Sequence, residues 1–88
     1  MELSEIRQEI NKTDSELIPM LEKRMKLSRQ VALYKKARGI PILNSAREQE
    51  ILYSAAASVD EDISKYMVEL YKQIMRVSRE YQAEIIEE

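Results

Sequence analysis

Residues 3–38 read LSEIRQEINKTDSELIPMLEKRMKLSRQVALYKKAR, the longest regular pattern in the chain. Apolar side chains recur there at spacings of three and four, which is the period of an α-helix that buries one face. They are Leu3, Ile6, Ile10, Leu17, Met20, Leu21, Leu27, Val31 and Tyr34. We therefore predict one helix over residues 3–38, about 54 Å long.

Two residues bear on the course of this helix. Pro19 interrupts the pattern, and a proline inside a helix removes one backbone hydrogen bond. Because the apolar spacing keeps its phase across Pro19, we predict a single helix, with two helices meeting near Pro19 as the alternative. Gly39 is the only glycine and follows a basic last turn, which marks the end of a helix.

The rest of the chain predicts two further helices. After a connector at residues 40–43, Asn44 or Ser45 caps a short second helix that runs to about residue 57, with Ser45 and Glu48 spaced as a capping box. A long third helix carries an apolar seam at Ile63, Met67, Leu70, Ile74, Val77, Tyr81 and Ile85. The predicted fold class is all-α, with residues 1–88 forming a single helical domain.

Composition excludes several kinds of chemistry. With 14 basic and 16 acidic residues the net charge is −2, which does not favour nucleic-acid binding. The chain has no Cys and no His, so thiol nucleophiles, imidazole bases and the usual zinc sites are absent. Lack of Cys fits a reducing cytoplasm, and no segment resembles a signal peptide or approaches membrane-spanning length. We expect a cytoplasmic protein with no metal.

Three cations lie on the otherwise apolar seam of the first helix: Arg7, Arg24 and Lys35. Lys35 follows Arg24 by three helical turns, about 16 Å, so two long side chains reaching toward each other leave a gap for a small dianion. Arg7 lies about 25 Å from Arg24 and cannot serve the same site within one straight helix. The alternative is that the aliphatic parts of these three side chains lie on the seam while their charged groups reach water.

The length of the first helix predicts a dimer. A compact domain of this size has a radius of gyration near 12 Å, so a 54 Å helix overhangs it and exposes much of its seam. Association along that seam, most simply as a twofold dimer, removes the exposure. Two antiparallel first helices would bring Arg7 of one chain near Arg24 and Lys35 of the other.

Four other polar residues are candidates for a binding site. Ser78 and Gln82 are four residues apart and share a helix face, and Arg47 and Glu48 open the second helix. The alternatives are core hydrogen bonds for the first pair and a solvated first turn for the second. The seam contains cations and neutral hydrogen-bonding groups but no paired acid and base. Such a set suits anion binding and electrostatic stabilisation better than hydrolysis.

Taken together, these features resemble one family, the all-helical chorismate mutases. The resemblance rests on residues 6–36, 39–52 and 66–82, which read IRQEINKTDSELIPMLEKRMKLSRQVALYKK, GIPILNSAREQEIL and YMVELYKQIMRVSREYQ. Members of that family are intertwined homodimers of three-helix chains with two shared active sites. The resemblance therefore implies a very long first helix, a short second and a long third in an intertwined helical homodimer.

The resemblance also implies roles for the cations and for the polar residues of the third helix. Arg24, Lys35 and Arg7 of the partner subunit would hold the two carboxylates of chorismate. Lys35 and Gln82 would donate hydrogen bonds to the ether oxygen, and Ser78 would assist at a carboxylate.

For the start of the second helix, the resemblance implies contacts with the rest of the substrate. Glu48 would accept a hydrogen bond from the ring hydroxyl, the backbone near Asn44 would assist, and Arg47 would line the pocket. Asn44 stands where some relatives carry an acid. The expected catalytic residues are therefore Arg24, Lys35, Glu48 and Gln82.

The implied reaction is the Claisen rearrangement of chorismate to prephenate, in the biosynthesis of phenylalanine and tyrosine. It is intramolecular and implies no cofactor, and the expected partners are the substrate and a second copy of the chain, with no nucleic acid or membrane. Two alternatives stay open: an isochorismate–pyruvate lyase, which shares this fold, and a non-catalytic helical dimerisation module.

Overall fold

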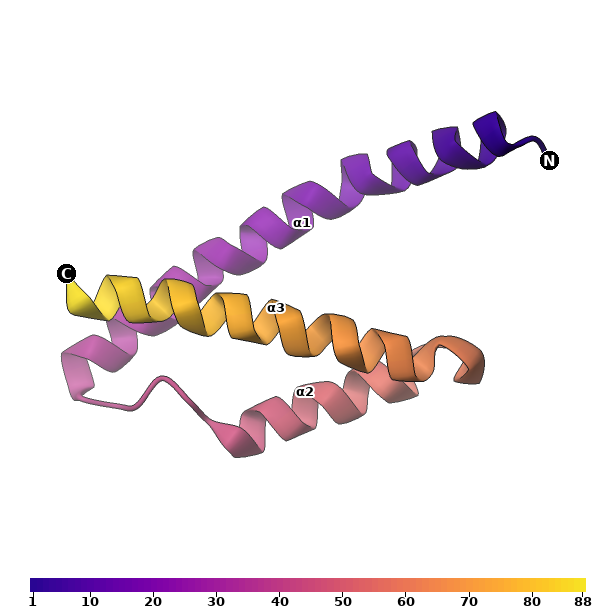
Figure 1. The fold of residues 1–88 in the computed structure, drawn as a ribbon. Coiled ribbons are helices and arrows are strands. Elements are labelled where there is room, and N and C mark those ends of the chain that lie inside the picture. The colour runs from indigo at the N-terminus through magenta and orange to yellow at the C-terminus, as the bar shows by residue number, and fades with distance from the viewer.

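The computed structural model describes residues 1–88 and contains three helices and no strand (Figure 1). Helix α1 spans Leu3–Arg38, α2 spans Ser45–Ala57 and α3 spans Glu61–Glu87. The predicted all-α class and the long–short–long order of the helices are confirmed.

Helix α1 is continuous through Pro19, so the alternative of two helices is wrong. Proline leaves one carbonyl of the preceding turn without its helical donor, and this turn is exposed, where water can replace that donor. The helix ends as predicted at Gly39, which adopts the left-handed conformation with φ 65°. The N–H of Ile40 donates to the carbonyl of Lys35 at 3.0 Å, which closes the last turn.

The start of α2 differs in one respect from the sequence prediction. Asn44 is the capping residue, and its side-chain oxygen accepts from the backbone N–H of Arg47 at 3.1 Å. The predicted capping box between Ser45 and Glu48 is wrong, because Ser45 is already the first helical residue. Glu48 is therefore not held at the helix start, and its carboxylate is free to reach α3.

Helix α3 packs on both α1 and α2, which do not pack on each other (Figure 1). The first part of α1 diverges from α3, and every residue from 1 to 23 is exposed; we call this segment the N-terminal arm. The longest extent of the chain is 53 Å and its radius of gyration is 16.0 Å, against about 12 Å for a compact domain of this length. The chain by itself is thus elongated, with a long unsupported arm.

Few side chains are buried, and nearly half of those are polar. The apolar ones are Ala32, Ala55, Met75 and Ile85, and the polar ones are Ser28, Ser78 and Gln82. The seam predicted for α3 is only partly interior: Ile85 is buried, whereas Ile63, Leu70 and Val77 are exposed. The inward face of α3 is rotated from that seam, because α1 and α2 approach it along Met75, Ser78 and Gln82.

Candidate active site

One pocket lies where α1, the connector, α2 and α3 meet. Its volume is about 320 Å³, at the lower end of the range for small-molecule sites. Seven of the eight residues predicted from the sequence line it: Arg24, Lys35, Asn44, Arg47, Glu48, Ser78 and Gln82. We call it the central pocket. It brings together side chains that are up to 58 residues apart in the chain.

The lining of the central pocket is strongly cationic. Its lining includes Arg24, Lys35, Arg47 and Arg79 but only one carboxylate, that of Glu48. Neither Arg24 nor Lys35 forms an ion pair within the chain, so both half-buried cations remain available to an anion. The ammonium group of Lys35 donates one hydrogen bond, at 2.6 Å, to the carbonyl of Ile42 in the connector, which orients it and leaves two N–H groups free.

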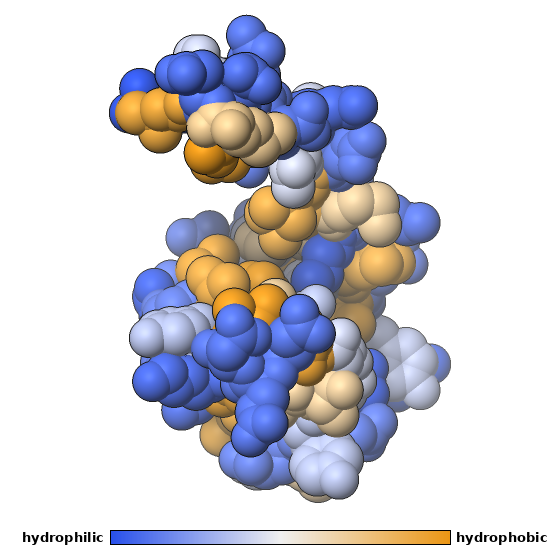
Figure 2. Space-filling view, turned by 90° about the vertical axis from the view of Figure 1, so that its right-hand side faces the viewer, coloured by the Kyte–Doolittle hydropathy of each residue, from blue (hydrophilic) through white to orange (hydrophobic).

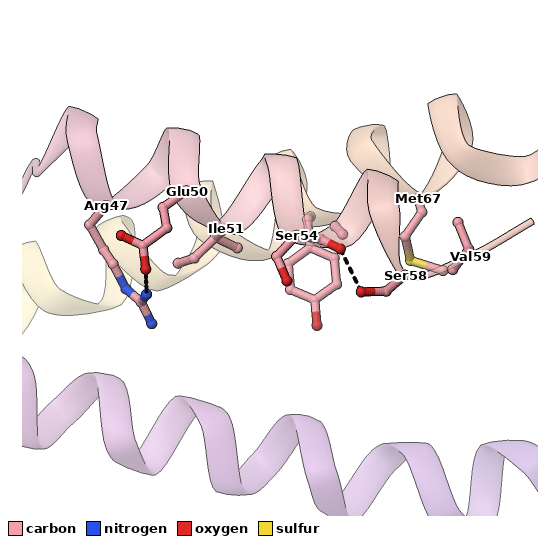
Figure 3. Close-up of a pocket in the computed structure, with 9 residues that line it drawn as sticks. Arg47, Glu50, Ile51, Ser54, Ser58, Val59 and Met67 are labelled. Atoms are coloured by element: carbon pink, nitrogen blue, oxygen red, sulfur yellow. Dashed lines mark hydrogen bonds and ion pairs between the residues drawn. The ribbon is translucent and has the colours of Figure 1, made fainter. Parts of the chain in front are cut away.

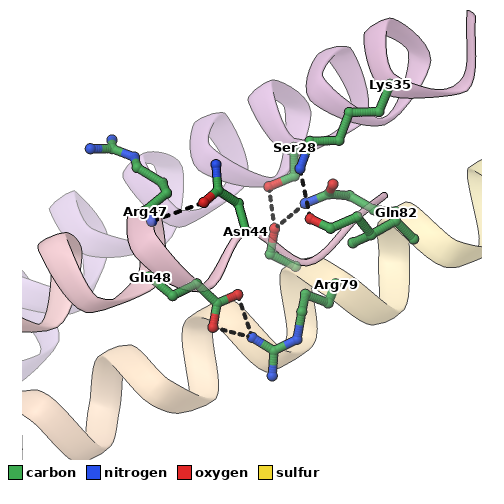
Figure 4. A network of polar contacts seen from close by, with 9 residues as sticks. Ser28, Lys35, Asn44, Arg47, Glu48, Arg79 and Gln82 are labelled. Atoms are coloured by element: carbon green, nitrogen blue, oxygen red, sulfur yellow. Dashed lines mark hydrogen bonds and ion pairs between the residues drawn. The ribbon is translucent and has the colours of Figure 1, made fainter. Parts of the chain in front are cut away.

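A chain of hydrogen bonds fixes the orientation of Gln82 (Figure 4). The Ser28 hydroxyl donates to the carbonyl of Arg24 at 3.1 Å, so it must accept from the Ser78 hydroxyl, 2.7 Å away. Because Ser78 has then used its only proton, it accepts from the amide nitrogen of Gln82 at 3.0 Å. The nitrogen end of the Gln82 side chain is thereby set, with a second N–H left for another acceptor.

The same amide has an unused acceptor. The side-chain oxygen of Gln82 is buried and has no hydrogen-bond partner. A buried polar atom without a partner is rare in proteins and is costly. A functional role is one explanation for such a group, and it agrees with the place of Gln82 in the lining of the pocket.

Arg47 and Glu48, in the first turn of α2, leave the helix in different directions (Figure 4). Glu48 turns to α3 and pairs with Arg79, at 2.6 and 2.5 Å from one guanidinium nitrogen. Arg47 pairs instead with Glu50 at 2.8 Å, and both of these side chains are mostly exposed. Arg47 therefore borders the pocket with its charge already balanced.

A second pocket, of about 400 Å³, runs along α2 beside the first (Figure 3). Its only charged groups are Arg47 and Glu50, which pair with each other, and most of its remaining lining is apolar. It lacks the free cations that distinguish the central pocket. We therefore take the central pocket as the candidate active site.

Arg7 is the one predicted residue that lies outside the central pocket. It is exposed on the N-terminal arm, seventeen residues before Arg24. Sequence reasoning missed two polar residues that do line the pocket, Ser28 and Arg79. Ser28 lies four residues after Arg24, and Arg79 three before Gln82, so helical spacing from the chosen residues was the signal for both.

The fold and the pocket define an all-helical chain with a small cationic site at the junction of three helices. The chain belongs to the chorismate mutase type II family, whose family model matches residues 6–83. Searches among curated proteins and among solved structures return no significant match. No helix has the length and apolar character needed to cross a bilayer.

Proposed function

We propose that the protein is a chorismate mutase, which rearranges chorismate to prephenate within the central pocket. The observation that carries the proposal is the convergence of two unpaired cations, Arg24 and Lys35, with the oriented amide of Gln82. Membership of the chorismate mutase type II family supports the choice of substrate. On this proposal the reaction belongs to the biosynthesis of phenylalanine and tyrosine.

The reaction needs no proton transfer from the protein. One C–O bond breaks and one C–C bond forms within a single molecule, so the protein can act by holding the enolpyruvyl arm over the ring. It can also stabilise the negative charge that grows on the ether oxygen as the C–O bond breaks. In this proposal Lys35 and Gln82 donate to that oxygen, while Arg24 holds a carboxylate with help from Ser78.

Glu48 is the acceptor for the ring hydroxyl in this proposal. It is the only carboxylate of the pocket, so it can both accept that hydrogen bond and repel a misplaced substrate carboxylate. Asn44 has its side-chain oxygen committed to the start of α2, which leaves its backbone to assist. The repulsion would orient the substrate, with its anionic groups toward Arg24 and Lys35.

The proposal is tested by incubating the purified protein with chorismate and, in parallel, with isochorismate. We expect chorismate to disappear and prephenate to form, with the product identified by NMR. Release of pyruvate from isochorismate without prephenate formation would make the protein a lyase instead. No turnover of either compound would favour a non-catalytic helical module.

We propose further that the active form is a dimer. An apolar groove of about 660 Å³ opens between the diverging parts of α1 and α3, lined mostly by large apolar side chains of both helices. Nearer its N-terminus, α1 exposes Leu3, Ile6 and Ile10 as well, and Figure 2 shows apolar surface on the arm and on the body beneath it. A second copy laid antiparallel would cover both surfaces, and would bring its own Arg7 to the central pocket.

We expect the protein to sediment as a dimer at micromolar concentration and to lose helix content when diluted to monomer. The reason is that a lone chain leaves most of its large apolar side chains in water, and folding then depends on association. Analytical ultracentrifugation, with circular dichroism on the same dilution series, measures both properties. A folded and active monomer would rule out the proposed dimer.

A further inference from the structure

The ion pair between Arg79 and Glu48 differs from every other ion pair of the chain. It joins α3 to α2, whereas the other four lie within one helix at spacings of three or four residues. The side chains of Arg79 and Glu48 are 34% and 23% exposed, whereas all the others are more than half exposed. Exposed ion pairs contribute little to the stability of a protein. The pair of Arg79 and Glu48 is therefore the one whose role needs an explanation.

The pair lies in the wall of the central pocket, together with two cations that form no ion pair. Glu48 has a flexible side chain, and without Arg79 the nearest unpaired cations of the same pocket are Arg24 and Lys35. A free carboxylate would be drawn to them, because opposite charges attract strongly in a partly buried site. Such a contact would neutralise the cations that an anionic substrate needs.

The geometry of the pair leaves Glu48 able to bind a ligand. One guanidinium nitrogen of Arg79 donates to both carboxylate oxygens, at 2.6 and 2.5 Å. An ionised carboxylate can accept about four hydrogen bonds, so each oxygen retains a free acceptor position. Arg79 can thus hold Glu48 without occupying the positions that a substrate hydroxyl would use.

We propose that Arg79 is a positioning residue: it aims Glu48 at the ring hydroxyl of the substrate and keeps Glu48 away from Arg24 and Lys35. This inference rests on the proposed function, since it assigns Arg79 to the same reaction. Arg79 acts through Glu48 and does not touch the substrate. Both parts of its effect pass through the Glu48 carboxylate, and the aiming of Glu48 needs the substrate hydroxyl as well.

The test compares Arg79→Met with Arg76→Met. Arg76 lies one turn earlier on α3, pairs with Glu80 at 2.7 Å, is half exposed and lies outside the central pocket. We expect Arg79→Met to lower kcat/KM for chorismate about ten- to hundredfold, the usual effect of losing a hydrogen bond to a charged group. Arg76→Met should match the wild type, and Arg79→Lys should recover part of the loss because it restores the charge.

Two measurements separate positioning from other roles. In a Glu48→Gln background, Arg79→Met should cause little further loss, because its effect passes through the Glu48 carboxylate. With a chorismate analogue whose ring hydroxyl is replaced by hydrogen, the loss of kcat/KM caused by Arg79→Met should be smaller than with chorismate, because the aiming of Glu48 no longer matters. A similar loss of kcat/KM on both substrates and in both backgrounds would overturn the inference. Such a result would mean that Arg79 binds a substrate carboxylate or only supports the fold.

Melting temperatures of all variants accompany the kinetics. If Arg79→Met unfolds, Arg79→Lys is measured in the same two backgrounds, and equal losses on both substrates again count against the inference. If wild type turns over chorismate and Arg79→Met equals Arg76→Met, this inference alone fails. If wild type does not turn over chorismate, the proposed function fails and this inference with it.

Discussion

Gln82→Ala is expected to lower kcat for chorismate at least about a hundredfold, with a smaller change in KM. The amide of Gln82 is held by Ser78 and Ser28, so its free N–H is preorganised for an acceptor in the pocket. Removing one preorganised donor to a developing oxyanion typically costs about 3–4 kcal/mol of transition-state stabilisation. Because the charge on the ether oxygen grows only as the bond breaks, the loss should fall on kcat.

Steady-state kinetics of the variant and of Gln49→Ala measure this effect. Gln49 is an exposed residue of α2 that lines neither of the two pockets described above, so the same substitution there should change neither kcat nor KM. A large rise in KM at unchanged kcat would assign Gln82 to substrate capture. A wild-type kcat would remove it from the mechanism.

Gln82→Glu should give activity that rises as the pH falls. An ionised carboxylate at this position would repel the growing charge on the ether oxygen, while a protonated one can donate a hydrogen bond as the amide does. The measurement is kcat/KM relative to wild type from about pH 5 to 8, and a flat ratio would contradict the assigned role.

Mixing Arg7→Ala with Arg24→Ala should restore activity that neither variant has alone. If Arg7 completes the site of the partner subunit, each mixed dimer contains one site with both arginines and one with neither. After random exchange of equal amounts, half of the dimers are mixed, so about one quarter of all sites are intact. We expect the mixture to approach about a quarter of wild-type kcat per site.

Subunit exchange is followed with a mass-tagged copy of one variant, so that mixed dimers are counted independently of activity. The double variant Arg7→Ala/Arg24→Ala mixed with wild type is the matched control, because its mixed dimers have two half-altered sites and should add no activity. Confirmed exchange without recovery would mean that Arg7 and Arg24 do not serve a shared site.

The helices could be predicted closely because their signals are local. The three-and-four spacing, the single glycine at Gly39 and the capping residue Asn44 each act within one or two turns. The fate of Glu48 could not be predicted in this way. Its spacing from Ser45 fits a capping box, and whether it instead reaches Arg79 depends on how α2 lies against α3.

Local patterns in the sequence suffice for the three helices, for the cations Arg24 and Lys35 on one face of the first, and for the shared face of Ser78 and Gln82. Which of these faces meet depends on how the helices pack. Ser28 and Ser78 touch across 50 residues of chain, and that contact orients Gln82. The physical reason is that helical periodicity sets the direction of a side chain relative to its own helix axis, whereas convergence of side chains depends on how the axes pack.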